Sequence, residues 1–305
     1  MRTGEAVRAG RTIEEASRSG ADYLAQNARE ALDGDDSRVV ARQLLAGVLG
    51  ISPSDLRWKK DESLTREEAC EFVEWLERYQ DFEPIPYILG HTFFYGYQIF
   101  CQRGVLIPRP DTETLVSHAI EYLISLNRPA RVLDLCTGTG CVALAIALSL
   151  LERDVPPAVV AASDLSISAL RLADQNILFH SAEAFISLIE SDGFDAFPNT
   201  AEPFDLIVSN PPYIQSAVVD QLSDSVVRYE PRLALDGGTD GLDLIQILIE
   251  GAGDRLRPGG RLMIEHGHDQ KQELLALARK RTDFVRVEDL PDMAGRDRVL
   301  IAVRR

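Results

Sequence analysis

A short proline-rich segment, Asn210-Pro-Pro-Tyr213, follows an apolar run at residues 206–209 that predicts a buried strand. Ligands of open α/β sheets bind at the carboxyl ends of the strands, so this segment stands where chemistry can occur. The Asn210 side-chain oxygen and the Pro211 carbonyl can both accept hydrogen bonds from one planar NH2 group, because proline fixes φ and has no N–H to compete. The pair therefore selects a neutral planar nitrogen, and it would stabilise the positive charge that develops as this nitrogen attacks an electrophile.

Pro212 and Tyr213 complete the segment, with Tyr213 as an aromatic wall beside the nitrogen. No general base is expected, because an amide N–H is too weakly acidic to lose its proton before the nitrogen reacts. The simpler alternative is that these prolines only terminate the strand.

A second candidate site lies at residues 131–146, where a strand pattern passes through a turn of small residues into a helix. Such a turn brings backbone amides close to a nucleotide-like ligand. Asp164 ends the next strand pattern, where its carboxylate can accept hydrogen bonds from both hydroxyls of a ribose. The turn residues expected to bind this ligand are Asp134, Cys136, Thr137, Gly138, Thr139 and Gly140.

The spacing Asp134-x-Cys-x-Gly-x-Gly140 resembles the turn of class I S-adenosylmethionine-dependent methyltransferases rather than the GxGxxG turn of pyrophosphate binders. This resemblance implies bound S-adenosyl-L-methionine, with Asp134 near the ammonium of its amino acid tail, and S-adenosyl-L-homocysteine as the product. Cys136 stands where most members carry their first glycine, so we expect φ < 0 at this residue or a different close approach. A plain strand-to-helix turn, with Asp164 capping the next helix, is the alternative reading.

Composition excludes several classes of function. The formal net charge is −16, from 32 Lys plus Arg and 48 Asp plus Glu, which argues against sequence-blind binding of nucleic acid. The four cysteines form no CxxC pair, so we expect free thiols in a reducing compartment, the cytoplasm. The longest apolar stretch, residues 142–151, is far shorter than the roughly 20 residues that span a bilayer, and no membrane association is expected. His266-Gly-His268 lacks a third ligand at suitable spacing, so no metal is expected.

The length of 305 residues predicts about two domains. Residues 1–83 predict a helical domain, in which Thr12-Ile-Glu-Glu15 and Thr65-Arg-Glu-Glu68 both fit the capping box that opens a helix. Residues 84–108, rich in aromatic and β-branched residues, predict a β-hairpin linker. Residues 109–305 alternate short apolar runs with helical patterns, which predicts an α/β fold with a Rossmann-like parallel sheet that ends in a β-hairpin. The predicted strands cover residues 132–135, 158–163, 206–209, 262–265, 284–288 and 298–303; residues 181–203 carry no clear pattern.

The chain from about residue 30 to residue 305 is similar to the PrmC/HemK family of release factor glutamine N5-methyltransferases. The resemblance is carried by segments that occur in the order seen in that family. These are Pro86-Tyr-Ile-Leu-Gly90, Phe94-Tyr-Gly96, Ile107-Pro-Arg-Pro-Asp-Thr-Glu113, Asp134-Leu-Cys-Thr-Gly-Thr-Gly140, Asn210-Pro-Pro-Tyr-Ile214, Tyr229-Glu-Pro231 with Ala234-Leu235, and Glu265-His-Gly267.

The resemblance implies a class I methyltransferase domain, preceded by a small helical domain that helps dock a peptide chain release factor. It further implies transfer of a methyl group from S-adenosyl-L-methionine to the side-chain nitrogen N5 of the glutamine in the release factor's Gly-Gly-Gln motif. By the same resemblance Asn210 and Pro211 would hold that amide, next to the cofactor, with Phe94 and Tyr213 packed around the glutamine side chain.

Other residues of the expected cofactor site are assigned less directly. The family has an acidic residue and a neighbour that contact the adenine, and Asp192 with Gly193 is the best match, with Asp195 as the rival. Arg109, in the proline-bounded segment, is expected to pair with an acid and to brace the floor of the cofactor site.

Two other functions remain as alternatives. An N6-adenine or other nucleic-acid amino-methyltransferase is one, because Asn-Pro-Pro-Tyr occurs in such enzymes too, but the net charge of −16 opposes it. A cofactor-binding interaction protein without turnover is the other, and the intact Asn210-Pro-Pro-Tyr213 segment opposes that. We expect a monomer that binds release factors and does not bind nucleic acid directly.

Overall fold

The computed structural model describes residues 10–199 and 201–305. The chain divides into two compact units. One is Met1–Gly90 with Ser223–Tyr229, and the other is His91–Leu222 with Glu230–Arg305. The first unit thus extends to residue 90 and includes a segment from much later in the chain, whereas the sequence led us to expect a continuous helical domain over residues 1–83.

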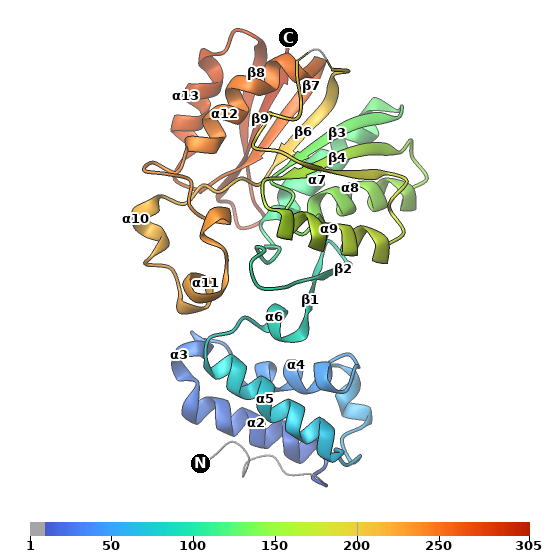
Figure 1. Ribbon diagram of the computed structural model, residues 1–305, viewed down its shortest axis with the longest axis vertical. Coiled ribbons are helices and arrows are strands. Elements are labelled where there is room, and N and C mark those ends of the chain that lie inside the picture. Colours follow the sequence, from blue (N-terminus) through green and yellow to red (C-terminus); the bar gives the residue numbers. More distant parts are fainter. Residues whose placement is uncertain (1–9, 200) are drawn as a thin grey trace. The chain divides into compact units, whose positions relative to one another are not determined.

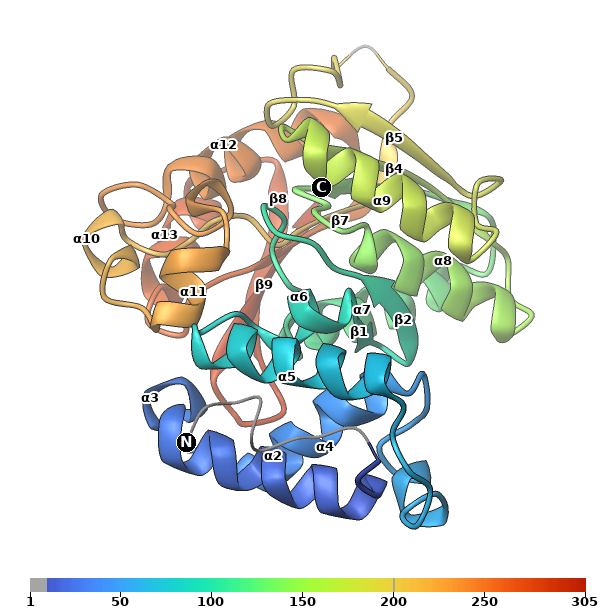
Figure 2. The same ribbon diagram turned by 60° about the horizontal axis from the view of Figure 1, so that its bottom comes forward.

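The described part of the first unit contains helices and no strand, and its longest helices lie side by side (Figure 1, Figure 2). Both predicted capping boxes are confirmed: Thr12 and Glu15 bond each other's backbone amides at one helix start, as Thr65 and Glu68 do at another. Its elements are α2 (Ile13–Asn27), α3 (Arg29–Leu32), α4 (Ser37–Val48), η1 (Asp55–Trp58), α5 (Arg66–Gln80), α6 (Ile85–Leu89) and α11 (Asp224–Tyr229).

The core of this unit forms where α2, α4 and α5 meet. Phe72 of α5 is fully buried there, among leucines that include Leu24 and Leu44. Gly20 of α2 makes room for it, because a Cβ at this glycine would stand 2.7 Å from the Phe72 ring. A larger residue at position 20 would therefore force the helices apart.

The segment 223–229 joins this unit through Asp81, which follows α5. The Tyr229 hydroxyl donates to the Asp81 backbone carbonyl at 2.7 Å and to its carboxylate at 2.9 Å. The Arg228 guanidinium pairs with the same carboxylate at 2.7 Å. These contacts join residues almost 150 positions apart, a separation that no local pattern reveals.

The second unit contains a seven-stranded sheet of order β5-β4-β3-β6-β7-β9-β8 (Figure 1). Neighbouring strands from β5 to β7 are parallel, and β9 is antiparallel to both β7 and β8. The mostly parallel sheet and its closing hairpin confirm the predicted α/β fold. The strands are β3 (Ala130–Leu135), β4 (Ala158–Asp164), β5 (Ile186–Glu190), β6 (Phe204–Ser209), β7 (Leu256–Glu265), β8 (Phe284–Pro291) and β9 (Asp297–Arg304), with a separate hairpin of β1 (His91–Phe94) and β2 (Tyr97–Phe100).

Helices cover both faces of this sheet (Figure 1). Val132 of β3 packs into a core shared with α7, α8 and α9, while its neighbour Leu133 packs into a core shared with α12 and α13. This alternation is the two-residue period of a strand buried on both sides. Within the described ranges, no helix is both long enough and apolar enough to cross a membrane. The helices of this unit are α7 (Thr112–Leu126), α8 (Cys141–Glu152), α9 (Ile167–Phe179), α10 (Ser216–Val219), η2 (Arg232–Ala234), α12 (Asp243–Ala252), η3 (Gly253–Arg255) and α13 (Lys271–Lys280).

The sheet order places β3 beside β6 in its centre. From β3 the chain proceeds outward through β4 and β5, and it then returns to β6 and continues toward the opposite edge. The carboxyl ends of β3 and β6 therefore flank a topological switch point, where the loops part and leave a crevice for a ligand.

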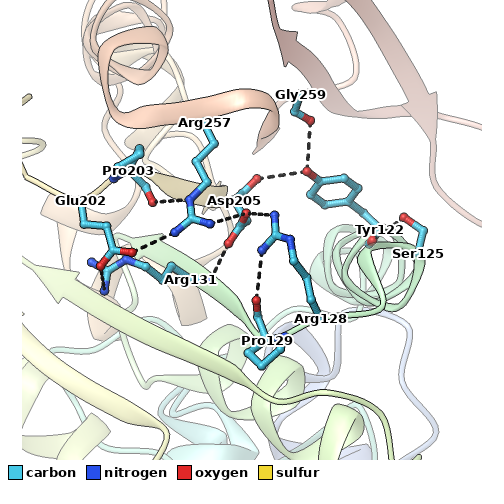
Figure 3. Close-up of polar contacts among 10 residues, drawn as sticks. All are labelled: Tyr122, Ser125, Arg128, Pro129, Arg131, Glu202, Pro203, Asp205, Arg257 and Gly259. Atoms are coloured by element: carbon cyan, nitrogen blue, oxygen red, sulfur yellow. Dashed lines mark hydrogen bonds and ion pairs between the residues drawn. The ribbon is translucent and has the colours of Figure 1, made fainter.

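The opposite, amino-terminal end of β6 carries a buried charge network around Asp205 (Figure 3). The Asp205 carboxylate accepts from the Arg128 guanidinium at 2.5 Å and from the Arg131 backbone N–H at 2.8 Å, and Arg257 lies 3.8 Å away. Burial alone would raise the pKa of this carboxyl, but these donors and positive charges lower it below its ordinary value. The network therefore connects the start of β6 to Arg128, which precedes β3, and to Arg131, near the start of β3.

We predict that Asp205→Ala lowers the free energy of unfolding at pH 7 by about 3 kcal/mol, since it removes the acceptor of a buried, charge-assisted network. The pKa of Asp205 is lower in the folded than in the unfolded chain, so its contribution is present above a pH of about 4 and is lost as the pH falls through the folded pKa. Urea unfolding of wild type and variant at pH 7 and at about pH 3 measures both effects. The exposed Asp174→Ala serves as the control. A variant as stable as wild type at pH 7 would contradict this role.

Candidate functional site

The turn from β3 to α8 takes left-handed backbone at three positions. Gly138 has φ +55° and Gly140, the residue before α8, has φ +79°. Cys136 has φ +61°, so our expectation of φ < 0 at this residue is wrong. The Cys136 backbone is thus held in a left-handed conformation that L residues other than glycine rarely adopt.

Asp164, at the end of β4, braces this turn. One of its carboxylate oxygens accepts from the Gly138 backbone N–H at 2.9 Å and the other from the Ser166 backbone N–H at 2.9 Å. Burial raises the pKa of Asp164 above its ordinary value, although these backbone N–H groups act in the opposite direction. The carboxylate keeps further lone pairs for a ligand, because each oxygen accepts one of these bonds and has capacity for another.

A cavity of about 320 Å³ opens at the carboxyl ends of β3, β4, β5 and β6. This is the position expected for a ligand at the switch point, and the volume falls in the range of small-molecule sites. An added Cβ at Gly138 would meet no atom within 4 Å, so this glycine keeps the wall beside the turn open. The predicted residues that line the cavity are Cys136, Thr137, Gly138, Thr139, Asp164, Asp192, Gly193, Asn210 and Pro212.

The remaining predicted residues do not line this cavity: Phe94, Asp134, Gly140, Pro211 and Tyr213. The structure places Asp134 behind the turn, where its carboxylate accepts from the Thr137 hydroxyl at 2.7 Å, and burial raises its pKa to about 7. Asp134 therefore stabilises the turn from inside. Asp195, the rival of Asp192, does not line this cavity but lines a neighbouring one, to which Asp192 and Gly193 also contribute.

Phe94 is buried in the core of the second unit and is 1% exposed. Its neighbour Phe93 is 67% exposed. The hairpin β1–β2 thus presents the two aromatic side chains in opposite directions, as alternation along a strand requires. The structure does not bring Phe94 to the cavity in which we expected it to contact a substrate.

Asn210 directly follows β6, and the NH2 group of its side chain is held by a hydrogen bond. Its Nδ2 donates to the Thr112 hydroxyl at 2.9 Å, which leaves Oδ1 free to accept within the cavity that Asn210 lines. Tyr213 is mostly buried, and its hydroxyl donates to Glu265 at 3.4 Å. Burial raises the pKa of Tyr213, so the hydroxyl stays protonated at neutral pH.

Arg109 pairs with an acid, as we predicted: its guanidinium contacts the Glu230 carboxylate at 2.5 Å. The other oxygen of Glu230 accepts from the Ile107 backbone N–H at 3.3 Å. Arg109, Ile107 and the following Pro231 all line the cavity, so the buried Glu230 holds this part of its wall together.

Several residues of the cavity wall were not predicted from the sequence. Thr112 lay within a segment that we recognised but gave no role. Leu165, Leu233 and Ile247 are large apolar residues that line the cavity and are about half exposed. Leu165 could have been predicted from its position directly after Asp164. No sequence pattern indicated that Leu233 and Ile247 would line the cavity.

Comparison with known families gives two matches. The PrmC N-terminal domain model matches residues 15–90, and the methyltransferase small domain model matches residues 110–287. Together they cover both units except the ends of the chain and residues 91–109.

Curated relatives are similar over most of the chain. A release factor glutamine methyltransferase of Chlorobaculum tepidum is 39% identical over 87% of this chain and 90% of the relative. The release factor glutamine methyltransferase of Bradyrhizobium diazoefficiens is 36% identical over 96% of this chain and 95% of its own. The release factor glutamine methyltransferase of Geobacter sulfurreducens is 37% identical over 91% of this chain and 92% of the relative.

Among solved structures, the T. thermophilus 16S rRNA N2 G1207 methyltransferase, in complex with AdoMet and guanosine, aligns with a TM-score of 0.50. It is 20% identical, and the alignment covers 70% of this chain and 50% of that protein. At this identity the likeness concerns the fold, and it agrees with the sheet described above.

The left-handed backbone at Cys136 should limit which residues this position tolerates. A β-branched residue suffers more than cysteine from φ +61°, whereas glycine adopts it freely, so Cys136→Val should be less stable than Cys136→Gly by about 1–2 kcal/mol. Urea unfolding followed by circular dichroism measures the difference. Equal stability of the two variants would show that the turn relaxes to another conformation.

Proposed function

The chain belongs to the family of release factor glutamine methyltransferases, and we propose that it methylates the side-chain nitrogen N5 of the glutamine in the Gly-Gly-Gln motif of a peptide chain release factor. The observation that carries this proposal is the position of Asn210, at the end of β6 and on the wall of the switch-point cavity. S-adenosyl-L-methionine is the proposed methyl donor, in keeping with the methyltransferase domain.

The residues of the cavity fit S-adenosyl-L-methionine. Asp164 offers a carboxylate with free lone pairs at the end of β4, where a ribose would present its hydroxyls. Gly138 leaves open the space that a side chain would fill. Asp192 and Gly193, at the end of β5, line the same cavity and would contact the adenine. When bound, this group supplies a methyl activated by a sulfonium.

Asn210 and Pro211 would orient the glutamine amide. The Asn210 Oδ1 and the Pro211 carbonyl accept hydrogen bonds from its two N–H groups, which holds the nitrogen in place. As this nitrogen gains positive charge during methyl transfer, the two carbonyl dipoles stabilise that charge more than they stabilise the neutral amide. The proton is lost to water afterwards, because a neutral amide is too weak an acid to lose it first.

The helical unit is proposed to dock the release factor, as its match to the PrmC N-terminal domain suggests. The alternative of an N6-adenine or other nucleic-acid methyltransferase is not favoured, because the relatives similar over most of the chain are glutamine methyltransferases. A translation factor as substrate points to the cytoplasm as the place of action.

The proposed function is tested by incubating the protein with methyl-labelled S-adenosyl-L-methionine and either an unmodified release factor or duplex DNA. Mass spectrometry of the peptides should locate the methyl group on the Gly-Gly-Gln glutamine. Label on DNA adenine and none on the release factor would overturn the proposal.

We predict that Asn210→Ala lowers kcat on the release factor by about 10²–10³, the usual effect of losing one acceptor that acts in the transition state. The affinity for S-adenosyl-L-methionine, measured by calorimetry, should change far less. Near-normal turnover of this variant would remove Asn210 from the mechanism.

For Asp164→Ala we predict weaker binding of S-adenosyl-L-methionine by about 1.5–3 kcal/mol, the scale of hydrogen bonds to a charged group. Because Asp164 also braces Gly138, the more conservative Asp164→Asn is the companion variant, and it should retain part of the affinity. Calorimetry that gives wild-type affinity for both variants would exclude Asp164 from the site.

A further inference from the structure

The two ends of an asparagine amide are nearly equal in size but opposite in hydrogen bonding. If Oδ1 of Asn210 faces the cavity, it can accept from the NH2 group of a glutamine. If the amide is flipped, its own NH2 faces the substrate NH2, and two donors meet without an acceptor. The proposed chemistry therefore requires something in the protein to determine which end of Asn210 faces the cavity.

Thr112 is the residue that contacts the other end. It lies in the first turn of α7, is 2% exposed, and its hydroxyl oxygen stands 2.9 Å from Asn210 Nδ2. A hydroxyl has one proton to donate and lone pairs to accept with, so by itself Thr112 could bind either end of the amide. The direction of the Thr112 hydroxyl proton therefore determines which end of the Asn210 amide Thr112 binds. This proton points to the stronger acceptor nearby.

Glu265, the last residue of β7, is that acceptor. It is 1% exposed, and the Thr112 hydroxyl is near enough to lower the pKa of its carboxyl. The carboxylate is short of donors: Oε1 accepts a long bond of 3.4 Å from Tyr213, and Oε2 accepts none from the described residues. An ionised carboxylate can only accept, so it draws the Thr112 proton and leaves Thr112 as an acceptor toward Asn210.

We propose that Glu265 and Thr112 are positioning residues that fix the Asn210 amide with Nδ2 toward Thr112 and Oδ1 toward the methyl-accepting nitrogen. This inference rests on the proposed function, since it explains how the proposed acceptor is oriented. Neither residue touches the substrate nitrogen in this account; both act through Asn210.

The charge on Glu265 is then part of the mechanism. The titratable or charged groups that face it are Tyr213 from the loop after β6, Arg298 from β9 and Asp111 from the start of α7. Burial raises the pKa of Glu265 to about 7, the hydroxyls of Thr112 and Tyr213 and the charge of Arg298 act to lower it, and Asp111 acts to raise it. Below this pH a protonated Glu265 can donate, Thr112 can then donate to Asn210, and the amide is free to flip. Turnover should fall as the pH is lowered through about 7.

The decisive comparison is Thr112→Val against Thr112→Ser. Valine keeps the shape but removes the hydroxyl, so kcat on the release factor should fall by about tenfold while KM changes little, as expected when one orienting hydrogen bond is lost. Serine restores the hydroxyl and should restore most of the turnover. Thr114→Val, two residues along α7, is the control for a hydroxyl-to-methyl change at a partly buried position of this helix. Calorimetry with S-adenosyl-L-methionine checks that each variant is folded.

A double-mutant cycle separates this role from a general structural one. In the Asn210→Ala background, Thr112→Val should produce no further loss of kcat, because Thr112 acts only through Asn210. Two losses that multiply, or a Thr112→Val variant with wild-type kcat and an unchanged pH profile, would overturn the inference. If Asn210→Ala itself turns over normally, the proposed function fails; if that variant is slow and only Thr112→Val is normal, this inference alone fails.

Discussion

One hydrogen bond, from Asn210 Nδ2 to the Thr112 hydroxyl, constrains the site more than any other contact. An amide nitrogen is a poor nucleophile that carries two protons, so a site that uses it must surround it with acceptors and keep competing donors away. The asparagine meets this need only in one of its two orientations. Its partner Thr112 comes from α7, far from β6 in the sequence, and the acid behind Thr112 comes from β7. The proposed chemistry therefore depends on the sheet holding α7, β6 and β7 together.

The order of the strands brings this about. Because β3 and β6 are neighbours while their connections run in opposite directions, the ends of β3 and β4 provide the turn and Asp164, and the end of β6 provides Asn210. The two halves of the proposed reaction, methyl donor and acceptor, then share one cavity. At the other end of β6, the buried Asp205 accepts hydrogen bonds from Arg128, just before β3, and from Arg131, within β3. These contacts fix the start of β6 relative to the start of β3, at the end of the sheet opposite the proposed site.

Much of this arrangement could be predicted from the sequence, because it is encoded in local patterns. The capping boxes, the alternation of strands and helices, the turn after β3 and the pairing of Arg109 with an acid all agree with the structure. Other features depend on contacts between distant residues or on which side of a strand faces inward. The hairpin residues Phe93 and Phe94 could not be assigned to a face because a two-stranded hairpin lacks a decisive pattern, and φ +61° at Cys136 follows from the tight turn, not from the residue. Strand β5 was missed because Ile186–Glu190 is short and mostly partly exposed.

The central claim is that the Asn210 side-chain oxygen and the Pro211 carbonyl hold the methyl-accepting nitrogen. The most direct measurement is a crystal structure of the protein with S-adenosyl-L-homocysteine and a peptide containing Gly-Gly-(N5-methyl)glutamine. In this product complex the modified nitrogen keeps one N–H, and we predict that it lies within hydrogen-bonding distance, about 2.7–3.2 Å, of one of these two oxygens and in van der Waals contact with the other. The Thr112 hydroxyl should still accept from Asn210. A peptide bound with its side-chain carbonyl, not its nitrogen, toward Asn210, or bound away from this residue altogether, would contradict the account.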